Sequence, residues 1–341
     1  MRYRNISNGG SPFTPWRHWK KYSRSPWEDQ AVHSARIKTS RARTECVCWK
    51  TIGLLFTVVV VVAACNGGTR RPAEEDGTPA PPAVPTGFEA LPYGFRPHPD
   101  FELTLGELRE RLAPLRGELR GPALAAPQAF LDQVAAALRE PPDLLRLVDK
   151  NNPLPADYIP DDLVELNRYE DRLTLNREDL SLRLVAMPDL LAMVEAARQD
   201  GIVLDLSSTY RSYRYQEWLF QYWVDEIGLE RAERSSARPG TSQHQLGTAI
   251  DFGSITGPFA EHPAGRWLAG NAWKFGFSLS YPRGFEEITG YIFEPWHFRY
   301  ISRAATRLER DFFGGIQQYL LEFWDEEGAF LRERYQPRKR P

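Results

Sequence analysis

The chain has few of the residues that build covalent cross-links or cysteine-based metal sites. Its 341 residues include only three cysteines, and Cys46 and Cys48 lie together near the N-terminus. This number excludes the disulfide framework that stabilises small secreted domains. Histidine is also scarce, with six in the whole chain. A metal site in this protein must therefore be assembled from histidine, aspartate and glutamate.

Most of the chain has no excess of basic over acidic residues. Residues 1–71 contain 13 Lys and Arg against 3 Asp and Glu, whereas the other 270 residues contain 30 against 42. Domains that bind nucleic acid normally carry a basic surface, so we expect no nucleic-acid partner for the acidic part. The basic N-terminal part instead suits a targeting segment.

The apolar run at residues 52–64 (IGLLFTVVVVVAA) is too short to span a bilayer comfortably. It follows a basic stretch and ends at Cys65, which is the arrangement of a secretory signal. Residues 62–65 (VAAC) resemble the bacterial lipobox, which implies cleavage before Cys65 and attachment of a lipid to its sulfur. A simple secretory signal and a short uncleaved anchor are the alternatives. We therefore expect an exported protein of a bacterial cell envelope, anchored to a membrane by lipid and facing the periplasm or wall.

Changes in composition divide the chain into five segments. The region after Cys65 is rich in proline, glycine and alanine, which predicts a flexible or semi-extended tether. Leucine and alanine then recur at helical spacing, interrupted by proline and glycine. The predicted segments are a basic head and signal (1–65), the tether (66–100), a short helical accessory segment (101–146), the main domain (147–310) and a C-terminal helical tail (311–341).

Within the main domain, short strand patterns are mixed with helical patterns. Helices are predicted over residues 188–199, 212–226 and 264–275, with another from about residue 303. Strands are predicted over residues 202–206, 248–252, 277–281 and 297–301. This mixture, with tight loops near residues 284 and 290, predicts an α+β fold with a small, mostly antiparallel sheet and flanking helices.

Two short segments contain the strongest metal-binding pattern, residues 242–251 (SQHQLGTAID) and 294–297 (EPWH). His244 precedes the predicted strand that carries Asp251, and Gly247 allows the chain to fold back so that the two side chains converge. Pro295 cannot donate to a β-ladder, so we expect Glu294 in the loop before the strand of His297.

These residues predict a catalytic zinc site. His244, Asp251 and His297 would hold Zn²⁺, a water would take the fourth position, and Glu294 would act as general base. For each of these residues taken alone, the alternative to a metal role is a structural role as a hydrogen-bonded side chain of the core. The coincidence of all four in two short segments favours the metal site.

The two segments match the SxHxxGxAxD and ExxH motifs of the VanY-type zinc D-alanyl-D-alanine carboxypeptidases. Residues 208–216 (STYRSYRYQ) also resemble the S-x-YRSYxxQ stretch of that family. The resemblance covers about residues 147–310. It implies a zinc peptidase fold and a reaction that removes the terminal D-alanine from peptidoglycan stem peptides.

The three motifs together add candidates for substrate binding. A planar guanidinium suits a free carboxylate or an oxyanion, and the resemblance implies that Arg211 polarises the scissile carbonyl or stabilises the tetrahedral intermediate. A surface salt bridge is its alternative. Ser242 and Gln216 are expected to seat the substrate, and Tyr210 and Trp296 to line the groove. Purely structural roles remain open for these four.

Other functions stay open at the level of the sequence. The same fold serves L,D-carboxypeptidases, D,D-dipeptidases and peptidoglycan endopeptidases. A catalytically silent wall-binding module and a structural lipoprotein that spaces the envelope are further alternatives. Glu294 favours an enzyme, because a binding module has no use for a general base. We expect a monomer whose partners are the stem peptide and, through Cys65, a membrane.

Overall fold

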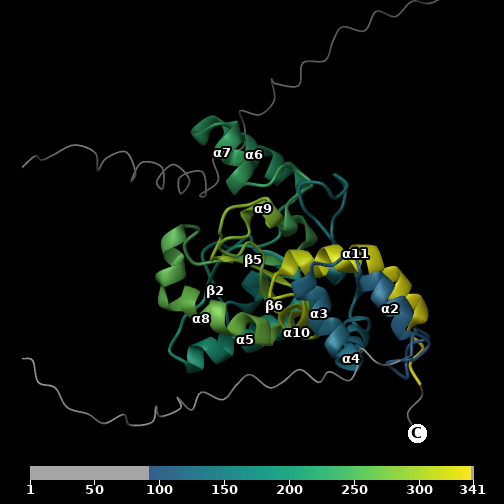
Figure 1. The fold of residues 1–341 in the computed structure, drawn as a ribbon. Coiled ribbons are helices and arrows are strands. Elements are labelled where there is room, and N and C mark those ends of the chain that lie inside the picture. The colour runs from purple at the N-terminus through teal and green to yellow at the C-terminus, as the bar shows by residue number, and fades with distance from the viewer. Residues whose placement is uncertain (1–91, 339–341) are drawn as a thin grey trace, which may run out of the picture. The chain divides into compact units, whose positions relative to one another are not determined.

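The computed structural model describes residues 92–338, which belong to one compact unit (Figure 1). The predicted basic head, the lipidation candidate Cys65 and most of the predicted tether lie outside the described residues. None of the described helices is both long and apolar enough to cross a membrane.

A five-stranded sheet forms the centre of the structure and has the order β2-β4-β5-β7-β6. β2 pairs with β4 in parallel, and every other neighbouring pair is antiparallel. β1 and β3 form a separate antiparallel pair. The strands are β1 (Leu163–Glu165), β2 (Thr174–Leu175), β3 (Ser181–Arg183), β4 (Asp205–Ser208), β5 (Ala249–Phe252), β6 (Phe277–Leu279) and β7 (His297–Tyr300). The predicted α+β fold with a small, mostly antiparallel sheet is confirmed.

Helices surround this sheet (Figure 1). The α-helices are α2 (Leu105–Leu112), α3 (Gly117–Ala125), α4 (Pro127–Ala137), α5 (Met187–Gln199), α6 (Tyr213–Ile227), α7 (Leu229–Ser235), α8 (Pro263–Asn271), α9 (Glu286–Thr289), α10 (Arg303–Phe312) and α11 (Gln317–Arg334). Single 3₁₀ turns are η1 (Pro142–Leu145), η2 (Leu166–Tyr169), η3 (Leu184–Ala186), η4 (Gln243–Leu246), η5 (Gly257–Glu261) and η6 (Ala272–Phe275).

Local sequence signals explain where several helices begin. Thr104 and Glu107 form a capping box at the start of α2, since each side chain accepts from the other residue's backbone N–H. Ser212 caps α6 by accepting from the backbone N–H of Tyr215. Proline occupies the first turn of α4, where its missing N–H costs no helical hydrogen bond.

Two predicted elements differ most from the observed ones. The strand predicted over residues 202–206 lies at Asp205–Ser208, because pairing with β2 starts only where Thr174 meets Asp205. The helix predicted over residues 264–275 divides into α8 and the 3₁₀ turn η6. Gly276 ends that turn with a positive φ of 80°, which glycine adopts without steric cost.

Two large apolar clusters form the core. One lies around the central sheet and includes side chains of α5 and α8. The other joins α2, α3 and α4 to α10 and α11, which lie on one side of the structure in Figure 1. Helices of the predicted accessory segment and of the predicted tail therefore share a core with α10. The boundaries predicted near residues 146 and 310 stay predictions.

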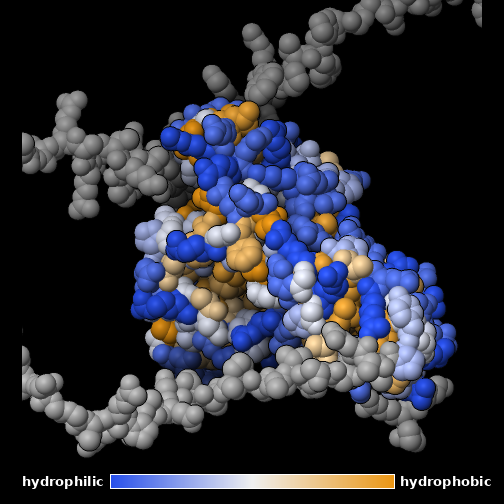
Figure 2. All heavy atoms as spheres, viewed as in Figure 1, coloured by the Kyte–Doolittle hydropathy of each residue, from blue (hydrophilic) through white to orange (hydrophobic). Residues whose placement is uncertain are grey.

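The face drawn in Figure 2 is largely hydrophilic, with apolar surface in separate patches. Large apolar side chains that are exposed include Trp218, Leu229 and Ile255. They come from different parts of the chain. Scattered residues of this kind are normal on a monomeric protein.

Candidate metal centre

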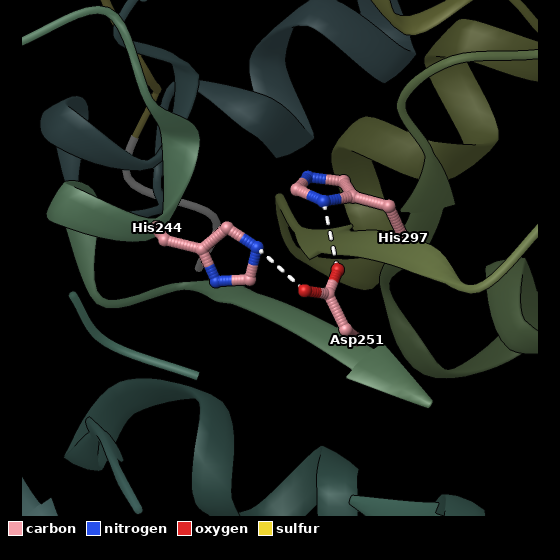
Figure 3. Close-up of side chains that lie close together, drawn as sticks. All are labelled: His244, Asp251 and His297. Carbon is pink, nitrogen blue, oxygen red and sulfur yellow. Dashed lines mark hydrogen bonds and ion pairs between the residues drawn. The ribbon is translucent and has the colours of Figure 1, made fainter. Parts of the chain in front are cut away.

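Three buried side chains from different elements converge at one end of the central sheet. His244 comes from η4, Asp251 from β5 and His297 from the first position of β7. One donor atom from each lies within 4.8 Å of the other two. Figure 3 shows the Asp251 carboxylate between the two imidazole rings. In the described residues this is the one group of at least three His, Cys, Asp or Glu side chains with such spacing.

Strand register brings Asp251 and His297 together. The two residues are directly paired on the antiparallel strands β5 and β7. Directly opposed residues on antiparallel strands place their side chains on the same face of the sheet. The carboxylate and the imidazole therefore meet without help from any loop.

A tight turn places His244 beside this pair. The Ser242 hydroxyl accepts from the backbone N–H of His244 and caps η4, and Gly247 ends η4 with a φ of 69°. A Cβ at Gly247 would lie 2.9 Å from the side chain of Leu163. Glycine is thus required both by the left-handed conformation and by the close approach.

His244 directs an unprotonated nitrogen at Asp251. Its Nδ1 lies 2.6 Å from the backbone carbonyl of Thr209, which can only accept a hydrogen bond, so Nδ1 carries the proton. Burial, together with the positive charge of Arg211, lowers the pKa of His244 to about 4, so the ring is neutral near pH 7. The buried Nε2 has no hydrogen-bond partner among the described residues, although it lies 3.2 Å from Asp251 Oδ2.

His297 faces the same carboxylate. Its Nδ1 lies 3.0 Å from Asp251 Oδ1, and its Nε2 lies 3.2 Å from the Gln243 side-chain oxygen. A proton on Nε2 leaves the Nδ1 lone pair toward Asp251.

The three side chains fit a divalent metal ion. The unprotonated His244 Nε2 lies 3.2 Å from the ionised Asp251 carboxylate, and the two repel each other unless a cation lies between them. Two histidines and one carboxylate are a donor set that catalytic zinc sites use. Ligands in a zinc site must also be deprotonated, as His244 and Asp251 are.

Glu294 lies in the turn before β7, as predicted. Its carbonyl accepts from the backbone N–H of His297, and its Oε2 lies 3.7 Å from His297 Nδ1. Burial, followed by the charge of Asp251, raises the pKa of Glu294 well above its usual range, and Arg211 opposes this. A divalent cation would act in the same direction as Arg211, because a bound ion is the largest local charge.

Arg211 also approaches the centre. Its Nη2 lies 3.7 Å from Asp251 Oδ2, and its Nη1 donates to the Gln216 side-chain oxygen over 3.0 Å. Gln216 is 1% exposed, and its Nε2 donates to the carbonyl of Ala237. The Gln216 amide therefore holds the Arg211 guanidinium in place.

The other substrate-binding candidates lie near the centre in different ways. Ser242 is buried and its hydroxyl serves the η4 cap. Tyr210 is half-buried, and its backbone N–H donates to the carbonyl of Ser181. Trp296 is half-buried and packs against the apolar cluster of the central sheet. Contact of Ser242, Gln216, Tyr210 and Trp296 with substrate stays a prediction.

Four residues that surround the ligands were not predicted from the sequence. Thr209 and Gln243 lie inside the recognised motifs, directly beside residues that were singled out, and that position was the available signal. Ser280, which directly follows β6, and Gln317, the first residue of α11, both contact Gln243. Nothing in the sequence pattern pointed to these two.

A model of the family described as VanY, D-alanyl-D-alanine carboxypeptidase, matches residues 179–303. The bifunctional D-Ala-D-Ala dipeptidase and D-Ala-D-Ala carboxypeptidase VanXYC of Enterococcus gallinarum is 34% identical over 175 residues, which cover 48% of this chain and 86% of that protein. The chain belongs to the VanY family. The resemblance predicted from the three motifs is confirmed.

Other proteins are also similar to this chain. The putative carboxypeptidase YodJ of Bacillus subtilis (strain 168) is 35% identical over 183 residues, covering 51% of this chain and 66% of YodJ. The solved structure of the LdcB LD-carboxypeptidase has 32% identity and a TM-score of 0.48, covering 55% of this chain and 88% of that one. The chain spans just under two thirds of YodJ and smaller shares of two enterococcal D-alanyl-D-alanine carboxypeptidases. All three metal-ligand candidates lie inside the VanY segment.

Proposed function

We propose that this protein is a zinc-dependent D-alanyl-D-alanine carboxypeptidase that removes the terminal D-alanine of peptidoglycan stem peptides. The observation that carries the proposal is the buried His244–Asp251–His297 group, with Glu294 and Arg211 beside it, inside a VanY segment. A general base and an anion-binding arginine beside a metal site are the parts that peptide hydrolysis requires.

Each residue at the centre has a separate role in the proposed reaction. Zinc held by the three donors would lower the pKa of a water and polarise the scissile carbonyl. Glu294 accepts a proton from the attacking water and passes it to the amine of the departing D-alanine as the C–N bond breaks. The Arg211 guanidinium stabilises the negative charge that develops on the carbonyl oxygen. Water is the nucleophile, so no covalent bond to the protein forms.

Three substrates and a metal measurement test the proposal. The purified protein should contain about one zinc per chain by elemental analysis, and it should release D-alanine from a stem pentapeptide. Release from the tetrapeptide instead would indicate an L,D-carboxypeptidase, and cleavage of free D-Ala-D-Ala a dipeptidase. Zinc without turnover of any peptide would indicate a binding module. A chain that takes up no zinc would overturn the assignment of the site.

We also propose that the protein is exported and held at a membrane by a lipid on Cys65, with the catalytic unit as a monomer. The basic stretch, the short apolar run and the lipobox-like residues before Cys65 support the anchor. The proline-rich residues that follow would separate the catalytic unit from the membrane. Labelled palmitate should be incorporated into the wild type and not into Cys65→Ala, and light scattering of residues 66–341 should give the mass of one chain.

A further inference from the structure

Gln317, the first residue of α11, lies outside the VanY segment at 179–303 and reaches a residue that contacts a metal-ligand candidate. We propose that Gln317 is a positioning residue that fixes the orientation of the Gln243 amide and thereby leaves His297 Nδ1 free for the metal. This inference rests on the proposed zinc site. It assigns a part of the metal centre to the C-terminal helix.

A chain of hydrogen bonds connects α11 to His297. His297 Nε2 lies 3.2 Å from Gln243 Oε1, and Gln243 Nε2 donates to Gln317 Oε1 over 3.0 Å. Gln317 Nε2 in turn donates to the backbone carbonyl of Ser278 over 3.4 Å. The side-chain amides of Gln243 and Gln317 thus each donate an N–H toward Ser278 and turn their oxygen toward His297.

The Ser278 carbonyl gives this chain its direction. A backbone carbonyl can only accept, so the NH₂ of Gln317 must face it and the oxygen of Gln317 must face Gln243. Gln243 then turns its own NH₂ toward Gln317 and its oxygen toward His297. That oxygen requires a proton on His297 Nε2, and the lone pair is left on Nδ1, beside Asp251. Reversing the chain would bring two carbonyl oxygens together at Ser278.

The Ser280 hydroxyl supports the same orientation. It donates to Gln243 Oε1 over 2.7 Å, which is the oxygen that also faces His297. A hydroxyl can rotate and can also accept, so Ser280 alone would tolerate either orientation of the amide. Gln317 is therefore the side chain that decides between them.

Burial makes the orientation costly to reverse. Gln317 is 1% exposed, Gln243 2%, and Ser278 and Ser280 3% each. Water cannot replace a mispaired amide group at these positions, and unpaired buried polar groups are strongly disfavoured. Partners that fix the tautomer and ring orientation of a ligating histidine typically change metal affinity about 10–100-fold.

Zinc affinity of matched variants tests the inference. Gln317→Met removes both the donor and the acceptor at nearly constant volume. Gln318→Met is the control, because the neighbouring Gln318 is also buried on α11 but bonds to Asp149 and Glu322. Competition with a zinc chelator should show binding about 10-fold weaker in Gln317→Met, as for partners of ligating histidines. Gln318→Met should bind like the wild type.

A second variant separates orientation from packing. Gln317→Glu keeps an acceptor oxygen toward Gln243, and burial favours the protonated acid, whose O–H donates to the Ser278 carbonyl. It should therefore hold zinc within about 2-fold of the wild type, far from the 10-fold loss expected of lost ligand positioning. Equal weakening in the Met and Glu variants would assign Gln317 a structural role and overturn the inference. Undiminished zinc binding by Gln317→Met would do the same.

One measurement needs no variant. In the zinc-loaded wild type, NMR should show a His297 Nε2–H proton that is protected from exchange with solvent by its bond to Gln243. A rapidly exchanging proton would overturn the inference even if Gln317→Met fails to fold. A wild type that binds no zinc would overturn the proposed function as well, whereas equal binding by wild type and Gln317→Met would overturn this inference alone.

Discussion

Single hydrogen bonds determine which nitrogen each histidine presents at the metal centre. His244 presents Nε2 because its Nδ1 donates to the Thr209 carbonyl. His297 presents Nδ1 because its Nε2 faces the Gln243 oxygen. The sequence motifs predicted both histidines as ligands, but a motif carries no information on tautomers, since these depend on atoms from other elements.

Glu294 allows a test at the level of one functional group. Glu294→Gln keeps the size of the side chain but cannot accept a proton, so turnover of the pentapeptide should fall by about 10²- to 10⁴-fold. Zinc content should remain near that of the wild type, because Glu294 is not among the three ligands. Steady-state kinetics and elemental analysis on the same preparation check both statements. Unchanged turnover would show that another group removes the proton.

Glu309 on α10 predicts a pH dependence of stability that is separate from the metal site. Burial raises the pKa of Glu309 to about 8, although the Ser278 hydroxyl and the charge of Arg310 act in the opposite direction. Below the usual pKa of 4.5, Glu309 is protonated in both the folded and the unfolded state, so it adds no pH dependence there. Between these two pKa values only the unfolded state ionises, so stability falls as pH rises and levels off above the folded pKa.

The variant Glu309→Gln removes that titration. Its melting temperature should exceed that of the wild type by several degrees at pH 8, because a difference of about 1 kcal/mol shifts Tm by about 2–4 °C in a domain of this size. At pH 4.5 the two proteins should melt together. Melting curves by circular dichroism at both pH values measure the difference. A difference that does not change with pH would contradict the assignment.

At the scale of elements, the junction between β7 and α10 combines a favourable helix cap with an unfavourable backbone conformation at the same residue. Ser302 has a φ of 81°, the one positive value outside glycine in the described residues. Its hydroxyl also caps α10 by accepting from the N–H of Ala305. The helix predicted from about residue 303 was correct in position, but the strained residue before it carries no sequence signal of its own.

Two substitutions at Ser302 should have opposite effects. Ser302→Gly relieves a conformation that costs about 1–3 kcal/mol and loses only a few tenths from the cap, so it should stabilise the protein by about 1 kcal/mol. Ser302→Ala keeps the strain and loses the cap, so it should destabilise by about 1 kcal/mol. Urea unfolding measures both. Destabilisation by the glycine variant would show that the cap outweighs the strain.

At the scale of the whole molecule, α11 completes a core that begins in the N-terminal helices. Leu320, Leu321, Phe323 and Leu331 are buried in the cluster that also contains residues of α2, α3, α4 and α10. The sequence predicted helices on both sides of the VanY segment but could not predict that they pack on each other. Helical periodicity shows which face of a helix is apolar, and it does not show which partner covers that face.

Removal of α11 should therefore prevent stable folding. Each of those large side chains contributes about 1.5–3 kcal/mol by burial, and the total approaches the stability of about 5–15 kcal/mol that holds for whole domains. A chain ending at residue 316 should lack a cooperative thermal transition, whereas a chain ending at residue 338 should melt like the full-length protein. A truncated chain with a normal transition would show that the catalytic unit folds without α11.

The sequence by itself determined the α+β class, the VanY family and the group of His244, Asp251, His297 and Glu294. These follow from short motifs, because strand alternation and a glycine-permitted turn act over a few residues. Only the tertiary structure decided that β5 and β7 pair Asp251 with His297 and that Gln317 reaches the metal centre through Gln243. These contacts join residues far apart in the chain, and their register and direction depend on how whole elements pack, which no local pattern encodes.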